Sequence, residues 1–378
     1  MADAVRKIIY LSGTRADFGL MQATLQRVAA VADLSVAVTG MHLDTDFGDT
    51  LDEIRRSSLR ICGEIPTDIG DRTPEGMSDS IGQCILGMTK LLQKEKPDIL
   101  LLLGDRGEML AGAIAALHLG IVSVHIHGGE RSGTVDEPIR HAISKLSHYH
   151  FVATEESRER LIRMGELPAR IEVTGAPGLD GIVELADVSR ADCVAALKLP
   201  SDSNFVLTLF HPVVQQANDA YDQTRAILLA LQRAGLPVLW LEPNADAGSG
   251  GIHKALEEVV LPDGSSQLQH MPRQLFCAAM KHCAVMVGNS SAGIIEAASF
   301  GTPVVNVGDR QRSRERNINV RDVGPDADAI HAAIGQSMLH GKWPCNNRFG
   351  DGCAGRRISD SLMALSLDRS ILEKTNTY

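Results

Sequence analysis

Short runs of apolar residues, each ending in a polar loop that often contains glycine, constrain the fold of this chain more than any other feature. In the first half these runs cover 7–11, 34–38, 98–103 and 121–126, with helical patterns at 18–32, 81–92 and 108–119. Continuous apolar strands that alternate with helices are typical of a parallel sheet covered on both faces. Residues 63–80 are rich in Gly, Pro and Asp, and we expect a surface excursion there.

The same pattern starts again near residue 203. Strands are expected at 205–210, 237–241, 284–287 and 303–307, with helices at 221–234 and 294–300. A chain of 378 residues is also too long for one ordinary core. We therefore predict an α/β protein of two doubly wound, Rossmann-like domains, covering 1–178 and 179–356, with an interdomain cleft. A helical stripe at Ile358, Leu362, Leu365 and Leu372 defines a C-terminal segment, 357–378.

Composition excludes several classes of partner. The net charge is −10 without a long basic run, and aromatic residues make up only 4%, which argues against a nucleic-acid partner. The longest apolar runs fall far short of the ~20 residues of a membrane helix, and no export signal is visible, so we expect a cytoplasmic protein without a membrane partner. The seven scattered cysteines favour free thiols and no structural zinc.

Unusual polar residues collect where the predicted strands end, which is the edge at which open α/β sheets bind ligands. Taken singly, each could be a solvated loop residue or a helix cap. Taken together, they indicate a ligand site. They are Arg15, Asp17, His42, Asp105, Arg106, His127, Glu130, Asp136, His211, Asn244, Ser290, Ser291 and Arg310.

The loop at 288–293, Gly-Asn-Ser-Ser-Ala-Gly, is the best phosphate candidate because it joins a strand to a helix. Ser290 or Ser291 could also be a simple N-cap, and both roles are compatible. The loop matches neither the P-loop nor the dinucleotide-binding signature. Glu296, in the following helix, could accept hydrogen bonds from a ribose, or could be an ordinary helix carboxylate.

Residues 125–150 are dense in titratable groups. A metal site is one interpretation, but the HExxH spacing is absent. His127, Glu130, Asp136 and Glu137 make a better acid/base set, since carboxylates and an imidazole can divide proton donation and acceptance. His148 and His150 are interpreted as packing histidines.

Several motifs carry a resemblance to one family. They are SGTRADFG (12–19), TGMH (39–42), GDR (104–106), HIHGGERSGTVDEPIRHAISKLSHYH (125–150), FHPV (210–213) and VGNSSAGIIEAASFGTPVVNVGDRQ (287–311). With this set the chain resembles the hydrolysing UDP-N-acetylglucosamine 2-epimerases of bacterial sialic-acid and legionaminic-acid pathways. It is similar also to the epimerase half of the bifunctional vertebrate enzyme. The resemblance covers nearly the whole chain, in order.

The resemblance implies a GT-B-like fold that holds UDP in the interdomain cleft, with the C-terminal helix crossing back onto the N-terminal domain. It also implies elimination of UDP to a 2-acetamidoglucal, hydration to the free sugar, no cofactor or metal, and a homodimer or homotetramer. Asp105 and Asp136 match the family's acid/base carboxylates. His211 is expected to contribute both to catalysis and to UDP binding. The other substrate contacts expected are Arg15, His42, Arg106, Asn244, Met271, Ser290, Ser291, Glu296 and Arg310.

Two positions depart from the family pattern. His127 stands where relatives commonly have glutamate, and Glu137 stands where close relatives often have aspartate. Because imidazole titrates near neutral pH, we predict that His127 takes over acid/base work at C1–C2 while Glu130 orients it or the substrate. The alternative is that His127 only stabilises its loop by hydrogen bonds.

The leading functional prediction is conversion of UDP-N-acetylglucosamine to N-acetylmannosamine and UDP. The same reaction on UDP-N,N'-diacetylbacillosamine is an alternative. A GT-B glycosyltransferase would share the fold and the nucleotide-sugar ligand, although it would not need the titratable set of 105–137. A non-catalytic nucleotide-sugar sensor would bind without turnover.

Overall fold

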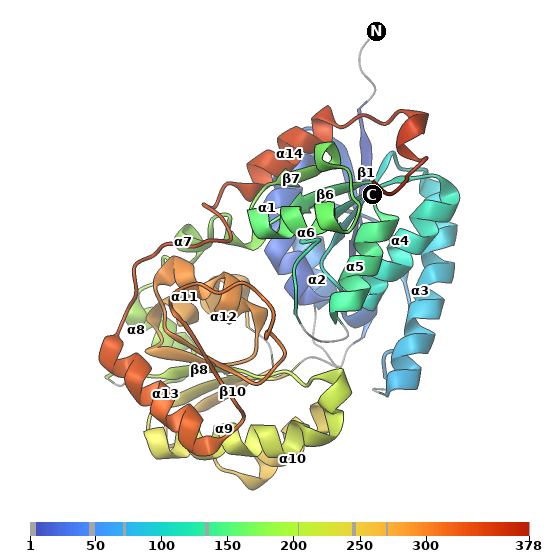
Figure 1. The fold of residues 1–378 in the computed structure, drawn as a ribbon. Coiled ribbons are helices and arrows are strands. Elements are labelled where there is room, and N and C mark those ends of the chain that lie inside the picture. Colours follow the sequence, from blue (N-terminus) through green and yellow to red (C-terminus); the bar gives the residue numbers. More distant parts are fainter. Residues whose placement is uncertain are drawn as a thin grey trace. The chain divides into compact units, whose positions relative to one another are not determined.

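A computed structural model of the chain describes residues 5–44, 50–70, 73–132, 136–202, 204–243, 247–269 and 271–377. The described residues form two compact units, each built on its own sheet (Figure 1). The first unit contains the chain up to Glu130, Asp136–Asp180 and the segment from Phe349 onward. The second contains Gly181–Arg348 together with Arg131 and Ser132. No helix in these ranges is both long enough and apolar enough to cross a membrane.

The first unit has a seven-stranded sheet of order β3-β2-β1-β4-β5-β6-β7, in which every pairing is parallel. The strands are β1 Lys7–Ser12, β2 Asp33–Thr39, β3 Arg60–Ile65, β4 Ile99–Leu103, β5 Val122–Ile126, β6 Tyr149–Val152 and β7 Ile171–Val173. The helices are α1 Arg15–Ala29, α2 Thr50–Arg56, α3 Pro74–Glu95, α4 Gly107–Leu119, α5 Asp136–Leu146 and α6 Glu155–Arg163, with α14 Ala354–Ala364 joining from the far end of the chain.

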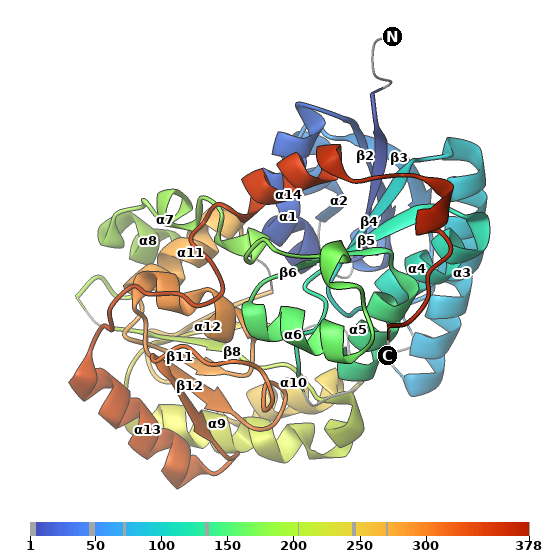
Figure 2. The ribbon, with the colours of Figure 1, turned by 45° about the horizontal axis from the view of Figure 1, so that its top comes forward.

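Alternation along the strands divides the first core into two layers. Ile8 and Tyr10 of β1 face a cluster shared with α1 and α14, whereas Ile9 and Leu11 face a cluster shared with α3 and α4. Successive side chains of a strand point to opposite faces, so a continuous apolar run buries both faces. Helices therefore cover both sides of this sheet, as Figures 1 and 2 show.

The C-terminal helix α14 completes one of these layers. It packs against α1, and its Ala354, Ile358 and Leu362 are buried in the same cluster as β1. The helix ends at Ala364, so the predicted helical stripe does not reach Leu365 or Leu372. Both of these residues nevertheless pack, partly buried, against that cluster.

The second unit has a six-stranded parallel sheet of order β10-β9-β8-β11-β12-β13. Its strands are β8 Val206–Leu209, β9 Val238–Leu241, β10 Ser266–Leu268, β11 Val285–Gly288, β12 Val304–Val307 and β13 Val320–Val323. Its helices are α7 Ile182–Leu185, α8 Arg190–Ala196, α9 Ala220–Ala234, α10 Ser249–Glu258, α11 Arg273–His282, α12 Ser291–Ile295 and α13 Ala327–His340. Two such doubly wound sheets confirm the predicted α/β, GT-B-like fold class.

Two local predictions were wrong. Residues 63–80 are not a surface excursion throughout, because β3 extends to Ile65 and α3 begins at Pro74, capped by Thr73 Oγ1. Proline is well tolerated in the first helical turn, where its missing N–H is not needed. The helix predicted at 294–300 is instead the short α12, followed by a separate 3-10 turn at Ala297–Phe300.

His125, His148 and His150 are buried in and beside the neighbouring strands β5 and β6. His125 of β5 and His150 of β6 are paired in register, and His148 lies just before β6 with its Nδ1 accepting the Ser123 N–H at 3.1 Å. Burial is the main reason that the pKa of His125 falls to about 3 and that of His148 to about 4. Both rings are therefore neutral in the folded protein near neutral pH. The prediction that His148 and His150 are packing residues is consistent with their burial.

We expect the free energy of unfolding to fall on acidification below about pH 6.5. The folded pKa values lie below the unfolded value, so the unfolded chain binds more protons in this range. The free energy of unfolding falls by about 1.4 kcal/mol per pH unit for each histidine that is neutral in the folded protein and protonated in the unfolded chain. Urea unfolding of wild type and His148→Gln at several pH values measures it. The slope of the unfolding free energy against pH should be smaller in His148→Gln by about the contribution of one histidine. An unchanged slope would contradict the conclusion that His148 is neutral in the folded protein.

Candidate functional site

In the first unit, the loop after β4 carries an ion pair. Asp105 pairs with Arg140 of α5, a guanidinium whose side chain is only 2% exposed. Arg106 is the N-cap residue of α4, and its Nε lies 3.6 Å from Glu108 Oε2. Asp136 is the first residue of α5, one turn before Arg140, so both project from the same face of that helix. The helix that holds Asp105 thus also carries the second predicted carboxylate.

The loop after β5 places His127 against Glu130. The two side chains are buried, and His127 Nδ1 contacts Glu130 Oε1. The backbone of His127 has φ +63°, in the left-handed region, and its N–H donates to Phe151 O at 3.0 Å. Residues other than glycine rarely adopt this backbone conformation, and those that do cluster at functional sites. The turn therefore fixes the imidazole beside the carboxylate at some backbone cost.

The loop after β1 is organised by Asp17. Its carboxylate accepts hydrogen bonds from Gly13 N at 3.0 Å, Thr14 N at 2.7 Å and Ser12 Oγ at 2.5 Å. Arg15 Nε lies 3.0 Å from both carboxylate oxygens of Glu53 in α2. The cation predicted to bind an anionic ligand is thus partly neutralised by a side chain that the sequence did not single out.

His42 lies in the interior. Its Nε2 is 2.9 Å from Ser12 Oγ, and its Nδ1 is 3.1 Å from Thr50 Oγ1. Burial is the main reason that its pKa is lowered from 6.5. Both ring nitrogens are thus engaged, and they join the loop after β2 to the end of β1 and the start of α2.

In the second unit, Asn289 is the centre of the loop after β11. Its side chain makes two hydrogen bonds with the backbone of His211, accepting from the N–H and donating to the carbonyl, each at 2.8 Å. Its own carbonyl accepts from Arg310 at 3.3 Å and from Gln311 at 3.1 Å. Asn289 therefore joins the loops after β8, β11 and β12, and so brings His211 and Arg310 to one place.

The residue before Asn289 has to be glycine. Gly288 has φ +137°, and a Cβ there would lie 1.8 Å from Leu209 O. The close approach of β8 and β11 leaves no room for a side chain. Ser290 follows as the N-cap of α12, its Oγ accepting from Ala292 N at 3.4 Å, and Ser291 begins that helix. The cap interpretation of Ser290 is confirmed.

Glu296, at the end of α12, is paired with a cation. Its Oε2 lies 2.6 Å from a terminal nitrogen of Arg273, the first residue of α11, and both side chains are largely buried. Met271, two residues before Arg273, is also buried. Asn244 lies outside the described residues. Among the described residues, no group of three or more His, Cys, Asp or Glu side chains could hold a metal ion.

Sequence reasoning missed the residues that hold these groups. Arg140 and Asn289 lie inside the quoted motifs but were not singled out, and Arg273 and Glu53 lie outside every motif. Only Arg140 had a signal in the sequence: it lies four residues after Asp136, so that on a helix both side chains share one face.

Comparisons with known proteins agree on one family. The family model described as UDP-N-acetylglucosamine 2-epimerase matches residues 25–363. The chain is 46% identical to a UDP-N,N'-diacetylbacillosamine 2-epimerase (hydrolyzing) of Legionella pneumophila, over 99% of this chain and all of the relative. It is 34% identical to a UDP-N-acetylglucosamine 2-epimerase of Neisseria meningitidis, over 92% of each chain. The fold matches the crystal structure of UDP-GlcNAc 2-epimerase from Neisseria meningitidis bound to UDP-GlcNAc. That match has a TM-score of 0.78 and 20% identity, and covers 95% of this chain and 100% of the other.

We expect Asn289→Ala to destabilise the second unit by about 2–4 kcal/mol, because it leaves the His211 N–H and carbonyl without their partner. Urea denaturation measures the change. Asn306→Ala is the matched control. Asn306 is equally buried on the neighbouring strand but donates a single hydrogen bond, to Asp322 at 2.7 Å, so its loss should be smaller. Equal losses would show that Asn289 has no special role in joining the loops.

Proposed function

The chain belongs to the UDP-N-acetylglucosamine 2-epimerase family and is a hydrolysing UDP-sugar 2-epimerase, and we propose that its substrate is UDP-N,N'-diacetylbacillosamine. The single observation that carries the choice of sugar is the 46% identity to a hydrolysing enzyme for that substrate over essentially the full length of both chains. The relative named for UDP-N-acetylglucosamine is 34% identical. The proposal therefore replaces the leading sequence-based prediction with its alternative.

The reaction needs two proton transfers at C2 and one broken bond at C1. Removal of the C2 proton and departure of UDP from C1 leave a 2-acetamidoglycal. Water then adds its hydroxyl to C1 and a proton to C2 on the other face, so C2 is inverted and the free sugar is released. Separate groups must accept the first proton and deliver the second.

The His127–Glu130 pair suits one of these roles. A carboxylate at Nδ1 selects the tautomer with the proton on Nδ1, which leaves Nε2 as the nitrogen that can exchange a proton with the sugar. We propose that His127 is a catalytic acid/base and that Glu130 orients it. The left-handed backbone at His127 supports this role, since it holds the ring in one place.

Asp105 suits a different role. The buried guanidinium of Arg140 favours its ionised form, which accepts protons rather than donating them. Asp136, on the same face of α5 as Arg140, is proposed as the second carboxylate of the set. Two carboxylates can divide proton acceptance and donation between them.

We propose that the second unit holds the UDP portion. Arg310 and the loop at Ser290 and Ser291, both fixed by Asn289, offer a cation and hydrogen-bond donors for a diphosphate. His211 is held beside them through its backbone. Glu296, oriented by Arg273, is the proposed acceptor for ribose hydroxyls. Asn244 and Met271 stay predicted contacts, as do Arg15 and Arg106 of the first unit.

The substrate test compares two sugars without any acceptor. We expect kcat/KM for UDP-N,N'-diacetylbacillosamine to exceed that for UDP-N-acetylglucosamine by about tenfold or more, because the sugars differ at C4 and C6. In D2O the released sugar should carry deuterium at C2, measured by mass spectrometry. Faster turnover of UDP-N-acetylglucosamine would refute the choice of substrate, and a product without deuterium would refute elimination. UDP release that requires an added acceptor sugar would instead identify a glycosyltransferase.

We expect His127→Ala to lower kcat by about 10²–10⁴-fold, the usual contribution of a positioned acid/base. His127→Gly is a matched control, because glycine adopts φ +63° without cost and should fold at least as stably while staying inactive. UDP binding by calorimetry should be unchanged in both variants. Near-wild-type turnover of His127→Ala, together with a large loss in Glu130→Gln, would transfer the role to Glu130.

A further inference from the structure

The chain beyond α14 runs back over the first unit and is fixed at several points (Figures 1 and 2). Arg6 donates to Leu362 O at 2.7 Å and to Leu365 O at 2.6 Å. Tyr149 donates to Ser366 O at 2.9 Å, and the N–H of Thr377 donates to Gly165 O at 2.9 Å. We call residues 365–377 the C-terminal strap. Each of these anchors is a specific polar contact, so the strap follows a defined path.

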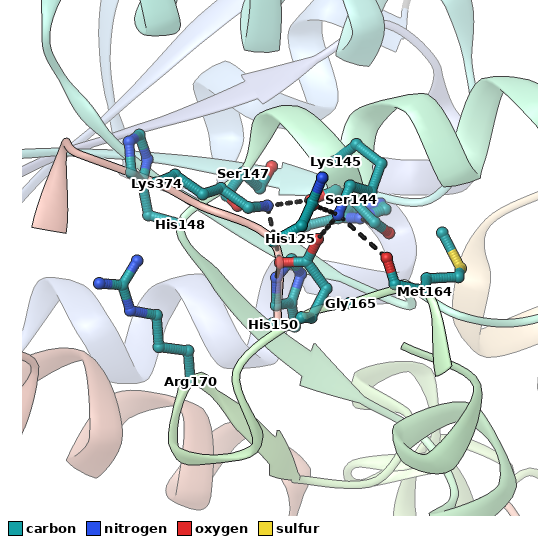
Figure 3. A network of polar contacts seen from close by, with 12 residues as sticks. His125, Ser144, Lys145, Ser147, His148, His150, Met164, Gly165, Arg170 and Lys374 are labelled. Atoms are coloured by element: carbon teal, nitrogen blue, oxygen red, sulfur yellow. Dashed lines mark hydrogen bonds and ion pairs between the residues drawn. The ribbon is translucent and has the colours of Figure 1, made fainter. Parts of the chain in front are cut away.

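Lys374 makes the most extensive contact of the strap (Figure 3). Its ammonium donates to Ser144 O at 2.9 Å, to Ser147 O at 2.5 Å and to Glu166 Oε2 at 2.7 Å, and its side chain is 12% exposed. The last carbonyls of a helix have no partner within the helix, and a cation there also interacts favourably with the helix dipole. Lys374 therefore caps the C-terminus of α5.

Glu166 gathers the charges around this cap. Besides Lys374, its carboxylate accepts from Lys145 at 2.6 Å and from His150 at 2.9 Å, and Lys145 also contacts Asn376 of the strap. Burial alone would raise the pKa of Glu166, but these three donors outweigh it and hold the pKa at about 2. Two elements of the first unit and the strap are thus tied to one buried carboxylate.

A short path leads from this cap to the acid/base loops. Ser144 Oγ donates to His125 Nδ1 at 2.9 Å, and His125 Nε2 donates to Gly104 O at 2.7 Å, directly before Asp105. Ser144 also lies against the turn after β5, since a Cβ built on Gly128 would be 2.9 Å from its Oγ. The helix that Lys374 caps therefore contacts both loops that carry proposed acid/base groups.

We infer that Lys374 is a positioning residue for the acid/base groups of the first unit, acting through α5, Ser144 and His125. The inference rests on the proposed function for the roles of Asp105, Asp136 and His127. The strap contributes no proposed catalytic side chain, but it positions the helix and the loops that carry these side chains. Loss of the ammonium frees the end of α5 and shifts groups whose alignment governs the chemical step.

The test replaces Lys374 in the full-length protein. Lys374→Met keeps the aliphatic stem and removes the charge, and we expect kcat to fall about tenfold or more while KM changes little, since misplaced reacting groups slow chemistry rather than binding. The UDP dissociation constant should be unchanged, and kcat is normalised to the folded fraction of each variant, which urea denaturation measures. Lys374→Arg, which keeps a cation, should recover most of the activity. Lys342→Met is the matched control, because Lys342 also donates to a backbone carbonyl, that of Lys281, but in the second unit. It should keep wild-type kcat.

A double-variant cycle separates positioning from general stabilisation. Ser144→Ala removes the hydroxyl that joins α5 to His125, and it gives an independent reading if Lys374→Met folds poorly. If both residues act along one path, the double variant should lose little more kcat than the worse single variant. Unchanged kcat per folded site in Lys374→Met, or fully additive losses, would overturn the inference. Absence of UDP release by the wild type would instead contradict the proposed function.

Discussion

The exclusion of charge from the interior of two parallel sheets governs the rest of this structure. Their strands are apolar on both faces because helices cover both sides, and an uncompensated polar group there would lose its hydration without gaining a partner. The charged side chains of the candidate site therefore follow the strands, whereas neutral polar residues inside a strand, such as Ser123 and His125 of β5, are hydrogen-bonded. Asp105 follows β4, His127 follows β5 and Asn289 follows β11. The proposed catalytic and binding groups therefore lie at these ends.

The charged residues at these ends are already paired before any ligand arrives. Asp105 lies with Arg140, Glu296 with Arg273, and Arg15 with Glu53. Pairing fixes the orientation of each side chain and its charge state, so little reorganisation is needed during the reaction. It also means that a diphosphate approaching Arg15 competes with Glu53. Discrimination between ligands then depends on how well they replace existing partners as well as on the contacts they add.

The sequence predicted the central strands β1, β2, β4 and β5 of the first sheet and β8, β9, β11 and β12 of the second, because apolar runs and the polar loops after them are local signals. It missed β6 and the edge strands or short strands β3, β7, β10 and β13. In β3, for example, only Ile65 is buried and no continuous apolar run forms. It also missed the start of α3, where Pro74 was interpreted as a loop residue although it lies in the first helical turn. The pairings of Arg140 with Asp105, Arg273 with Glu296 and Glu53 with Arg15 could not be predicted, since tertiary folding brings these residues together. Asn289 was visible in its motif, but its part in joining three loops depends on sheet order.

The return of α14 to the first unit has a consequence for how the molecule is made. Ala354, Ile358 and Leu362 fill the same core as the first strand, yet the ribosome synthesises them only after the whole second unit. The emerging first unit therefore exposes the apolar face of α1 that α14 later covers throughout that interval. The nascent chain can complete its second unit on its own, whereas its first unit has to wait until α14 has been synthesised. The order of synthesis and the order of folding are thus opposed in this protein.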